Sequence, residues 1–181
     1  YVMNVENNTT TDADGNIIPT KLWFVATNDM LDITGENRGN DLLITVTYAD
    51  KHKETYLVKN GAVRNDIQIG VNALKNDVGI KIDFSKTAII NPKTGEKCGV
   101  FIIGSQGSDT IYGSAGKDEI NGAGGGDLID GMAGDDDIFG YASTDVRSVY
   151  GTGNLGNDGN DEIYDVFGGD VIDAGAGSQD V

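Results

Sequence analysis

The sequence predicts an all-β protein in which an irregular β unit leads into a stacked, one-dimensional repeat. From Gly104 the chain repeats every nine residues, with glycine at positions one and four, aspartate at position six and isoleucine at position eight. A fixed short period is the sequence signature of stacked repeats. In residues 1–103, apolar and polar side chains alternate over several short runs, which is typical of half-buried strands.

The expected strands of residues 1–103 are short and are separated by turn residues such as Asn60-Gly61 and Asn91-Pro92. They are Leu22–Ala26, Leu42–Tyr48, Thr55–Val58, Ile67–Val71, Ile80–Phe84, Thr87–Ile90 and Val100–Ile103. Either a small sandwich or an irregular β-helix accommodates them. The β-helix is favoured because the last strand leads directly into the repeat, and a repeat with uncovered strand edges would invite edge pairing.

Two acidic motifs in this region are interpreted as turns. Gly39–Leu43 copies half of a nonapeptide, but it precedes a strand and is read as an ordinary turn. Asp12–Asn16 resembles the opening of an EF-hand loop, whose twelfth position requires a glutamate. That position is Trp23 here, so an ordinary loop is expected.

The repeat consists of four consecutive units, Gly104–Tyr112, Gly113–Asn121, Gly122–Asp130 and Gly131–Phe139. In each unit, six residues with two or more glycines form a tight turn, and the last three form a short strand whose isoleucine faces the core. Two units make one coil, so aspartates eighteen residues apart share an edge. One edge carries Asp109, Asp127 and Asp145, and the other carries Asp118 and Asp136.

The turns offer only oxygen atoms to a cation: aspartate carboxylates and backbone carbonyls. Oxygen donors with flexible, high coordination suit calcium better than zinc, copper or iron. Magnesium requires a smaller octahedral cage, which carbonyl-rich turns supply poorly. The repeat therefore predicts a row of several calcium ions.

These units resemble the RTX (hemolysin-type calcium-binding) repeats of bacterial secreted proteins, closely over Gly104–Phe139 and more loosely over Gly156–Asp173. The resemblance implies a parallel β-roll with calcium in its turns, export by a type I secretion machinery, and a location outside the cell or at the bacterial surface. The expected metal-binding residues are the glycines and aspartates of the turns: Gly104, Gly107, Asp109, Gly113, Gly116, Asp118, Gly122, Gly125, Asp127, Gly131, Gly134, Asp136, Asp145, Gly156, Gly159, Asp161, Gly168 and Asp170.

The pattern weakens after Phe139. The unit Gly140–Ser148 has Ser143 at position four and Arg147 at the apolar position, and Val149–Leu155 interrupts the period. The expected organisation is a flanking or capping unit (1–98), a first roll block (99–148), an insertion (149–155) and a second, truncated block (156–181). Because the last unit stops short, we expect the chain to be a piece of a longer protein whose further RTX blocks would be partners.

The net charge of −16 lies almost entirely in the repeat. Residues 1–103 carry 13 acidic and 11 basic side chains, whereas residues 104–181 carry 16 and 2. This surface makes nucleic acid and anionic membranes poor partners. Without cations, a glycine-rich segment of this charge is expected to be disordered, so ion binding and folding become one event.

An active site is not expected. The one histidine, His52, lies in a charged turn, and neither a G-x-S-x-G nor an H-E-x-x-H motif occurs. Cys98 is expected to be a buried small hydrophobe. No stretch reaches the ~20 apolar residues of a membrane-spanning helix. A calcium-binding segment of a toxin, of an adhesin or of a surface-layer protein stays open, as does a non-catalytic part of a polysaccharide-active β-helix enzyme.

Overall fold

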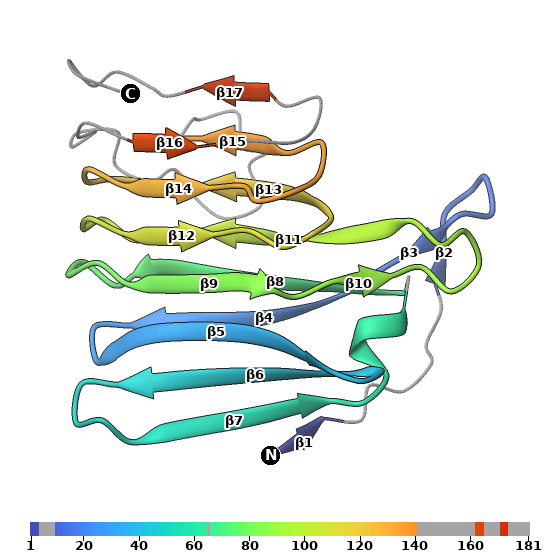
Figure 1. Ribbon diagram of the computed structural model, residues 1–181, viewed down its shortest axis with the longest axis horizontal. Helices are drawn as coiled ribbons and strands as arrows, with labels where there is room; N and C mark the ends of the chain where they lie inside the picture. The colour runs from blue at the N-terminus through green and yellow to red at the C-terminus, as the bar shows by residue number, and fades with distance from the viewer. Residues whose placement is uncertain (4–9, 65, 141–161, 165–170, 174–181) are drawn as a thin grey trace.

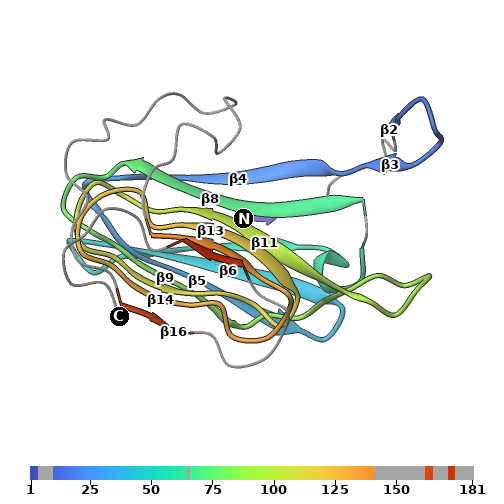
Figure 2. The ribbon, with the colours of Figure 1, turned by 90° about the horizontal axis from the view of Figure 1, so that it is seen from above.

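Two β-sheets face one another, and the chain winds from one to the other in stacked coils (Figure 1). The computed structural model describes residues 1–3, 10–64, 66–140, 162–164 and 171–173. Seen from above, the sheets form two layers on either side of the core (Figure 2). The chain begins at one end of the stack, and the repeat strands follow one another toward the other end.

The first sheet has eight strands and the second has six along its main path. In spatial order, the first contains β1 (Val2–Met3), β7 (Lys53–Val58), β6 (Asp41–Tyr48), β5 (Met30–Arg38), β9 (Lys81–Lys86), β12 (Thr110–Tyr112), β14 (Leu128–Asp130) and β16 (Glu162–Tyr164). The second contains β17 (Val171–Asp173), β15 (Asp137–Phe139), β13 (Lys117–Asn121), β11 (Lys97–Ile103), β8 (Ile67–Lys75) and β4 (Thr20–Thr27). Beside them lie β10 (Ile89–Ile90), which pairs with β11, the hairpin of β2 (Thr10–Thr11) and β3 (Ile17–Ile18), and the short 3₁₀ helix η1 (Gly61–Val63).

Strand β11 joins the irregular part of the chain to the repeat. It pairs in parallel with β8 on one side and with β13 on the other. In the first sheet, β9 likewise pairs in parallel with both β5 and β12. The irregular part is therefore the β-helix of the two expected alternatives, and its coils continue into the roll. The expected division between residues 98 and 99 falls inside β11.

Near the end of the stack away from the repeat, the first sheet contains antiparallel strands. Strands β5, β6 and β7 form a meander that extends the first sheet beyond the coils. Strand β5 was missing from the sequence prediction, because two of its core-facing positions are Ile33 and Gly35 and give little alternation. The ring of Phe84 takes the space of the missing side chain, since a Cβ on Gly35 would lie 2.6 Å from Phe84 Cε1.

One ladder of apolar side chains runs inside each sheet. Aligned residues of the first sheet are Ile33, Ile82, Ile111 and Ile129, and those of the second are Val71, Ile102, Ile120 and Ile138. All eight side chains are completely buried and belong to one core cluster. The predicted inward position of the repeat isoleucines is confirmed, and the core continues without a break from the irregular coils into the repeat.

Candidate metal-binding turns

The repeat turns stack into two columns, one at each edge of the coils (Figure 1). Column one contains the turns Ser105–Asp109 and Ala123–Asp127, and column two contains Ser114–Asp118 and Met132–Asp136. Each turn connects a strand of one sheet to a strand of the other. Its glycines can adopt the backbone angles that such a tight turn requires. The aspartates at position six end the turns and are all buried, with exposures of 0–3%.

Each carboxylate reaches the coil that precedes it by eighteen residues. Asp127 Oδ1 accepts a hydrogen bond from the backbone N–H of Asp109 at 2.9 Å. Asp136 Oδ1 accepts one from the N–H of Asp118 at 2.7 Å. The predicted stacking of aspartates eighteen residues apart is confirmed for these two pairs, which lie on opposite edges.

The first repeat turns make the same contact with the irregular coils. Asp109 Oδ1 accepts a hydrogen bond from the N–H of Ile80 at 2.8 Å. Asp118 Oδ1 accepts one from the N–H of Val100 at 2.6 Å. The irregular coils carry no nonapeptide. They nevertheless offer backbone N–H groups to the aspartates of the following coil, as the repeat coils do.

Carbonyl and carboxylate oxygens crowd the position-one glycines. A Cβ on Gly104 would lie 2.5 Å from Asp109 Oδ2, and one on Gly113 would lie 2.5 Å from Asp118 Oδ2. On Gly122, a Cβ would lie 2.9 Å from the carbonyl oxygen of Gly140. A side chain at these positions would fill the space between carboxylate and carbonyl, so only glycine leaves it open.

The position-four glycines also stack in pairs. A Cβ on Gly125 would lie 2.6 Å from the carbonyl oxygen of Gly107. In column two, Gly134 lies over Gly116, and a Cβ on Gly134 would lie 2.7 Å from Asp136 Oδ1. At position one, the closest neighbour of a Cβ on Gly113 is likewise the backbone of Gly131. The structure thus brings the predicted glycines together with the predicted aspartates.

The donor set fits calcium. Within the described residues, no three Asp, Glu, His or Cys side chains converge on one point, whereas backbone carbonyls lie beside the aspartate carboxylates. Calcium accepts this mixture of carboxylate and carbonyl oxygens. The predicted residues Asp145, Gly156, Gly159, Asp161, Gly168 and Asp170 lie outside the described part of the chain.

The sequence prediction did not include the residues at position two of the turn. Ser105 donates to Asp109 through both its backbone N–H and its hydroxyl, each at 2.6 Å. Ser114 donates to Asp118 in the same two ways, again at 2.6 Å. Because position two varies from unit to unit, the repeat pattern gives no signal for this contact.

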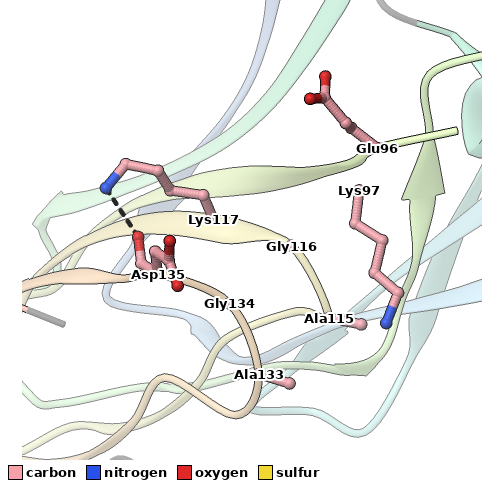
Figure 3. A pocket seen from close by; sticks show the side chains of 8 residues that line it. All are labelled: Glu96, Lys97, Ala115, Gly116, Lys117, Ala133, Gly134 and Asp135. Carbon is pink, nitrogen blue, oxygen red and sulfur yellow. Dashed lines mark hydrogen bonds between the residues drawn. The ribbon is translucent and has the colours of Figure 1, made fainter. Parts of the chain in front are cut away.

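Lys117 places a positive charge on the outside of column two (Figure 3). Its Nζ donates to the carbonyl oxygen of Asp135 at 2.7 Å and lies 3.0 Å from Asp137 Oδ2, so it links two successive coils. The lysine borders an open groove of about 710 Å³, with Lys97 and Glu96 on the far side. Residues 104–181 contain only two basic side chains, and this one offsets part of the local negative charge.

Burial raises the pKa of two carboxyls of the metal-free turns. The pKa of Asp118 rises to about 7, chiefly because burial disfavours the charged form, with the carboxylate of Asp136 adding to the effect. The pKa of Asp109 is also raised by burial, against the lowering effect of the hydrogen bonds from Ser105. Near neutral pH, the metal-free turns are therefore sensitive to protons.

Where the Asp118 turn is folded without metal, we expect it to lose stability as the pH rises from 5 to 8. A carboxyl whose folded pKa lies above its unfolded value contributes fully below the unfolded value, and this contribution is lost as the pH rises through the folded pKa. For Asp118 the loss is at most about 1.4 kcal/mol per pH unit. Urea denaturation in EDTA across this range measures it. Asp118→Asn should flatten the dependence and the exposed control Asp135→Asn should not; equal slopes in both variants would contradict the assignment.

The two residues considered for other chemistry lie away from the columns. His52 is half exposed after β6, where its Nδ1 lies 2.5 Å from Asp50 Oδ1 and its ring stacks on Tyr48. Cys98 is partly buried against the core, and burial raises the pKa of its thiol. No helix among the described residues is long and apolar enough to cross a membrane.

Comparison with protein-family models found a match in the repeat region of the chain. A family model described as the RTX calcium-binding nonapeptide repeat (4 copies) matches residues 101–129, 121–146 and 155–178. The matched residues include both turn columns and all four buried aspartates. Comparisons with curated proteins and with solved structures gave no match.

Proposed function

Since this chain carries RTX calcium-binding nonapeptide repeats over residues 101–146 and 155–178, we propose that it is the calcium-responsive segment of a secreted bacterial protein. The calcium-binding β-roll itself follows from the repeats and the parallel sheets. The proposal adds that the roll is largely unfolded at the low calcium level of the cytoplasm. It folds outside the cell, after export through a type I secretion machinery.

The observation that carries the proposal is the burial of four carboxylates in two columns. Asp109, Asp118, Asp127 and Asp136 are each at most 3% exposed. Taking an ionised carboxylate out of water costs several kcal/mol unless an opposite charge or hydrogen bonds compensate. Within residues 104–140, Lys117 is the only basic side chain. A calcium ion in each column would supply the missing charge.

The same charge balance explains why folding would follow calcium. Residues 104–181 have a net charge of −14 and 19 of the 27 glycines, a composition that disfavours a compact state without counterions. Each ion would join two coils and allow the isoleucine ladders to close. Extracellular calcium modules bind in the range of roughly 10⁻⁴ to 10⁻³ M, so the ion would be absent inside the cell and present outside.

A calcium titration followed by circular dichroism tests the proposal. We expect the β signal of the chain in EDTA to grow as calcium rises to ~10 mM, and the change to be cooperative because coils contact only their neighbours. Magnesium at the same concentration is the matched control and should substitute poorly. A β signal that is the same in EDTA and in calcium would refute calcium-dependent folding.

A further inference from the structure

The residue at position two divides the four described turns into two pairs. The first two turns have Ser105 and Ser114 at this position, and the next two have Ala123 and Met132. The backbone follows the same division. Ala123 and Met132 have left-handed φ values of 75° and 74°, whereas neither serine has a positive φ.

In the first pair, protein donors surround the carboxylate. Asp109 accepts hydrogen bonds from the N–H and the hydroxyl of Ser105 and from the N–H of Ile80. Asp118 accepts the equivalent three from Ser114 and Val100. All six bonds measure 2.6–2.8 Å. Such donors offset part of the cost of burying the carboxylate, although burial still raises the pKa of both groups. Their positive ends also occupy directions from which a cation would approach.

In the second pair, the backbone N–H of the position-two residue donates to a side chain other than the aspartate at position six. The N–H of Ala123 donates to Asn121 Oδ1 at 2.8 Å, and the N–H of Met132 donates to Asp130 Oδ1 at 2.9 Å. Neither side chain has a hydroxyl. A left-handed conformation costs an ordinary residue about 1 kcal/mol, and such outliers are frequent where a ligand compensates for them.

We propose that the roll contains two kinds of turn. Ser105 and Ser114 close the first two turns without calcium, and calcium binding begins at the third and fourth turns, with Asp127 and Asp136 as carboxylate ligands. This inference rests on the proposed calcium function and specifies which turns perform it. It narrows the ligand set predicted from the sequence, in which all four turns were equivalent.

The division gives the first repeat coil a distinct task. Strand β12 pairs directly with β9 of the irregular part, and β13 pairs with β11, which in turn pairs with β8. Ile111 and Ile120 belong to the same core cluster as Ile82 and Val71. A first coil closed by serines can fold together with the irregular coils when calcium is absent. It then offers the amides of Asp109 and Asp118 as a template for the next, calcium-dependent coil.

Amide hydrogen exchange in the whole chain distinguishes the two kinds of turn. In EDTA, the amides of Ile80 and Val100 should be protected, because their acceptors Asp109 and Asp118 belong to the closed turns. The amides of Asp109 and Asp118, which donate to the next coil, should gain at least tenfold protection when calcium is added. Equal calcium-dependent gains at all four amides would overturn the inference.

Calorimetric calcium titration of variants provides a second test. Ser105→Gly combined with Ser114→Gly removes both hydroxyls and frees the backbone to adopt the left-handed conformation, so the number of bound ions should increase. The matched control is Ser108→Gly in the exposed part of the same column. An unchanged number in the double variant would overturn the role of the two serines.

Aspartate variants separate the inference from the proposed function. Asp127→Asn and Asp136→Asn should each weaken calcium binding at least tenfold more than Asp109→Asn and Asp118→Asn. Equal weakening in all four would overturn the division of turns while leaving the calcium function standing. Absence of calcium binding to the unaltered chain would instead refute the proposed function.

Discussion

Replacing Gly104 with alanine is expected to destabilise the calcium-loaded protein by about 3 kcal/mol, the upper part of the range for overpacking a tight interior. The new Cβ would lie 2.5 Å from Asp109 Oδ2 and 2.9 Å from the carbonyl carbon of Gly122. Both are shorter than real Cβ contacts allow. The carbonyl carbon belongs to the backbone of the next coil, so relief requires the coils to separate, and their parallel hydrogen bonds resist this.

Gly95 provides the matched control for this substitution. It has a left-handed φ of 76° in the loop between β10 and β11, and a Cβ there would meet nothing within 4 Å. Gly95→Ala should therefore cost only the conformational term of about 1 kcal/mol. Guanidinium denaturation of both variants at ~5 mM calcium gives the comparison. Equal losses would show that coil spacing does not constrain position one.

The repeat was predictable because its glycine, aspartate and isoleucine positions each have a single physical task. The isoleucine at position eight must face the core. Two aspartates that are eighteen residues apart must stack on the same edge of the coils. Period alone fixes both relations, and Ile111 pairs with Ile129 as expected. The strands of the irregular part, such as β6 and β8, were found by alternation for the same reason.

The missed features depend on contacts between residues far apart in the sequence. Strand β5 has Gly35 at a core position only because the ring of Phe84 fills that place from β9. The antiparallel meander of β5, β6 and β7 could not be distinguished from further coils, because short alternating strands serve both. The role of Ser105 depends on where the carboxylate of Asp109 points, which the variable second position of the nonapeptide does not reveal.

Truncating Ile120 to alanine is expected to destabilise the calcium-loaded protein by about 2–5 kcal/mol, the usual range for removing a large aliphatic side chain from a core. Ile120 is completely buried and lies between Ile102 and Ile138 in the ladder of the second sheet. The neighbouring repeat strands β12, β14 and β15 each contribute one buried side chain to the core between the sheets. A cavity at Ile120 can therefore close only if the sheets approach, which the hydrogen-bonded turns at both edges oppose.

Because calcium binding and folding of the roll are linked, this loss should also appear in the calcium response. Ile120→Ala should shift the midpoint of the calcium titration to higher concentration, although no candidate calcium ligand has been altered. Ile18→Ala is the control, because Ile18 is 49% exposed in the β2–β3 hairpin; it should leave both the denaturation and the calcium midpoint nearly unchanged. A lower stability of Ile120→Ala with an unchanged calcium midpoint would mean that ions bind turns already formed. The closing of the isoleucine ladder would then not be part of the binding event.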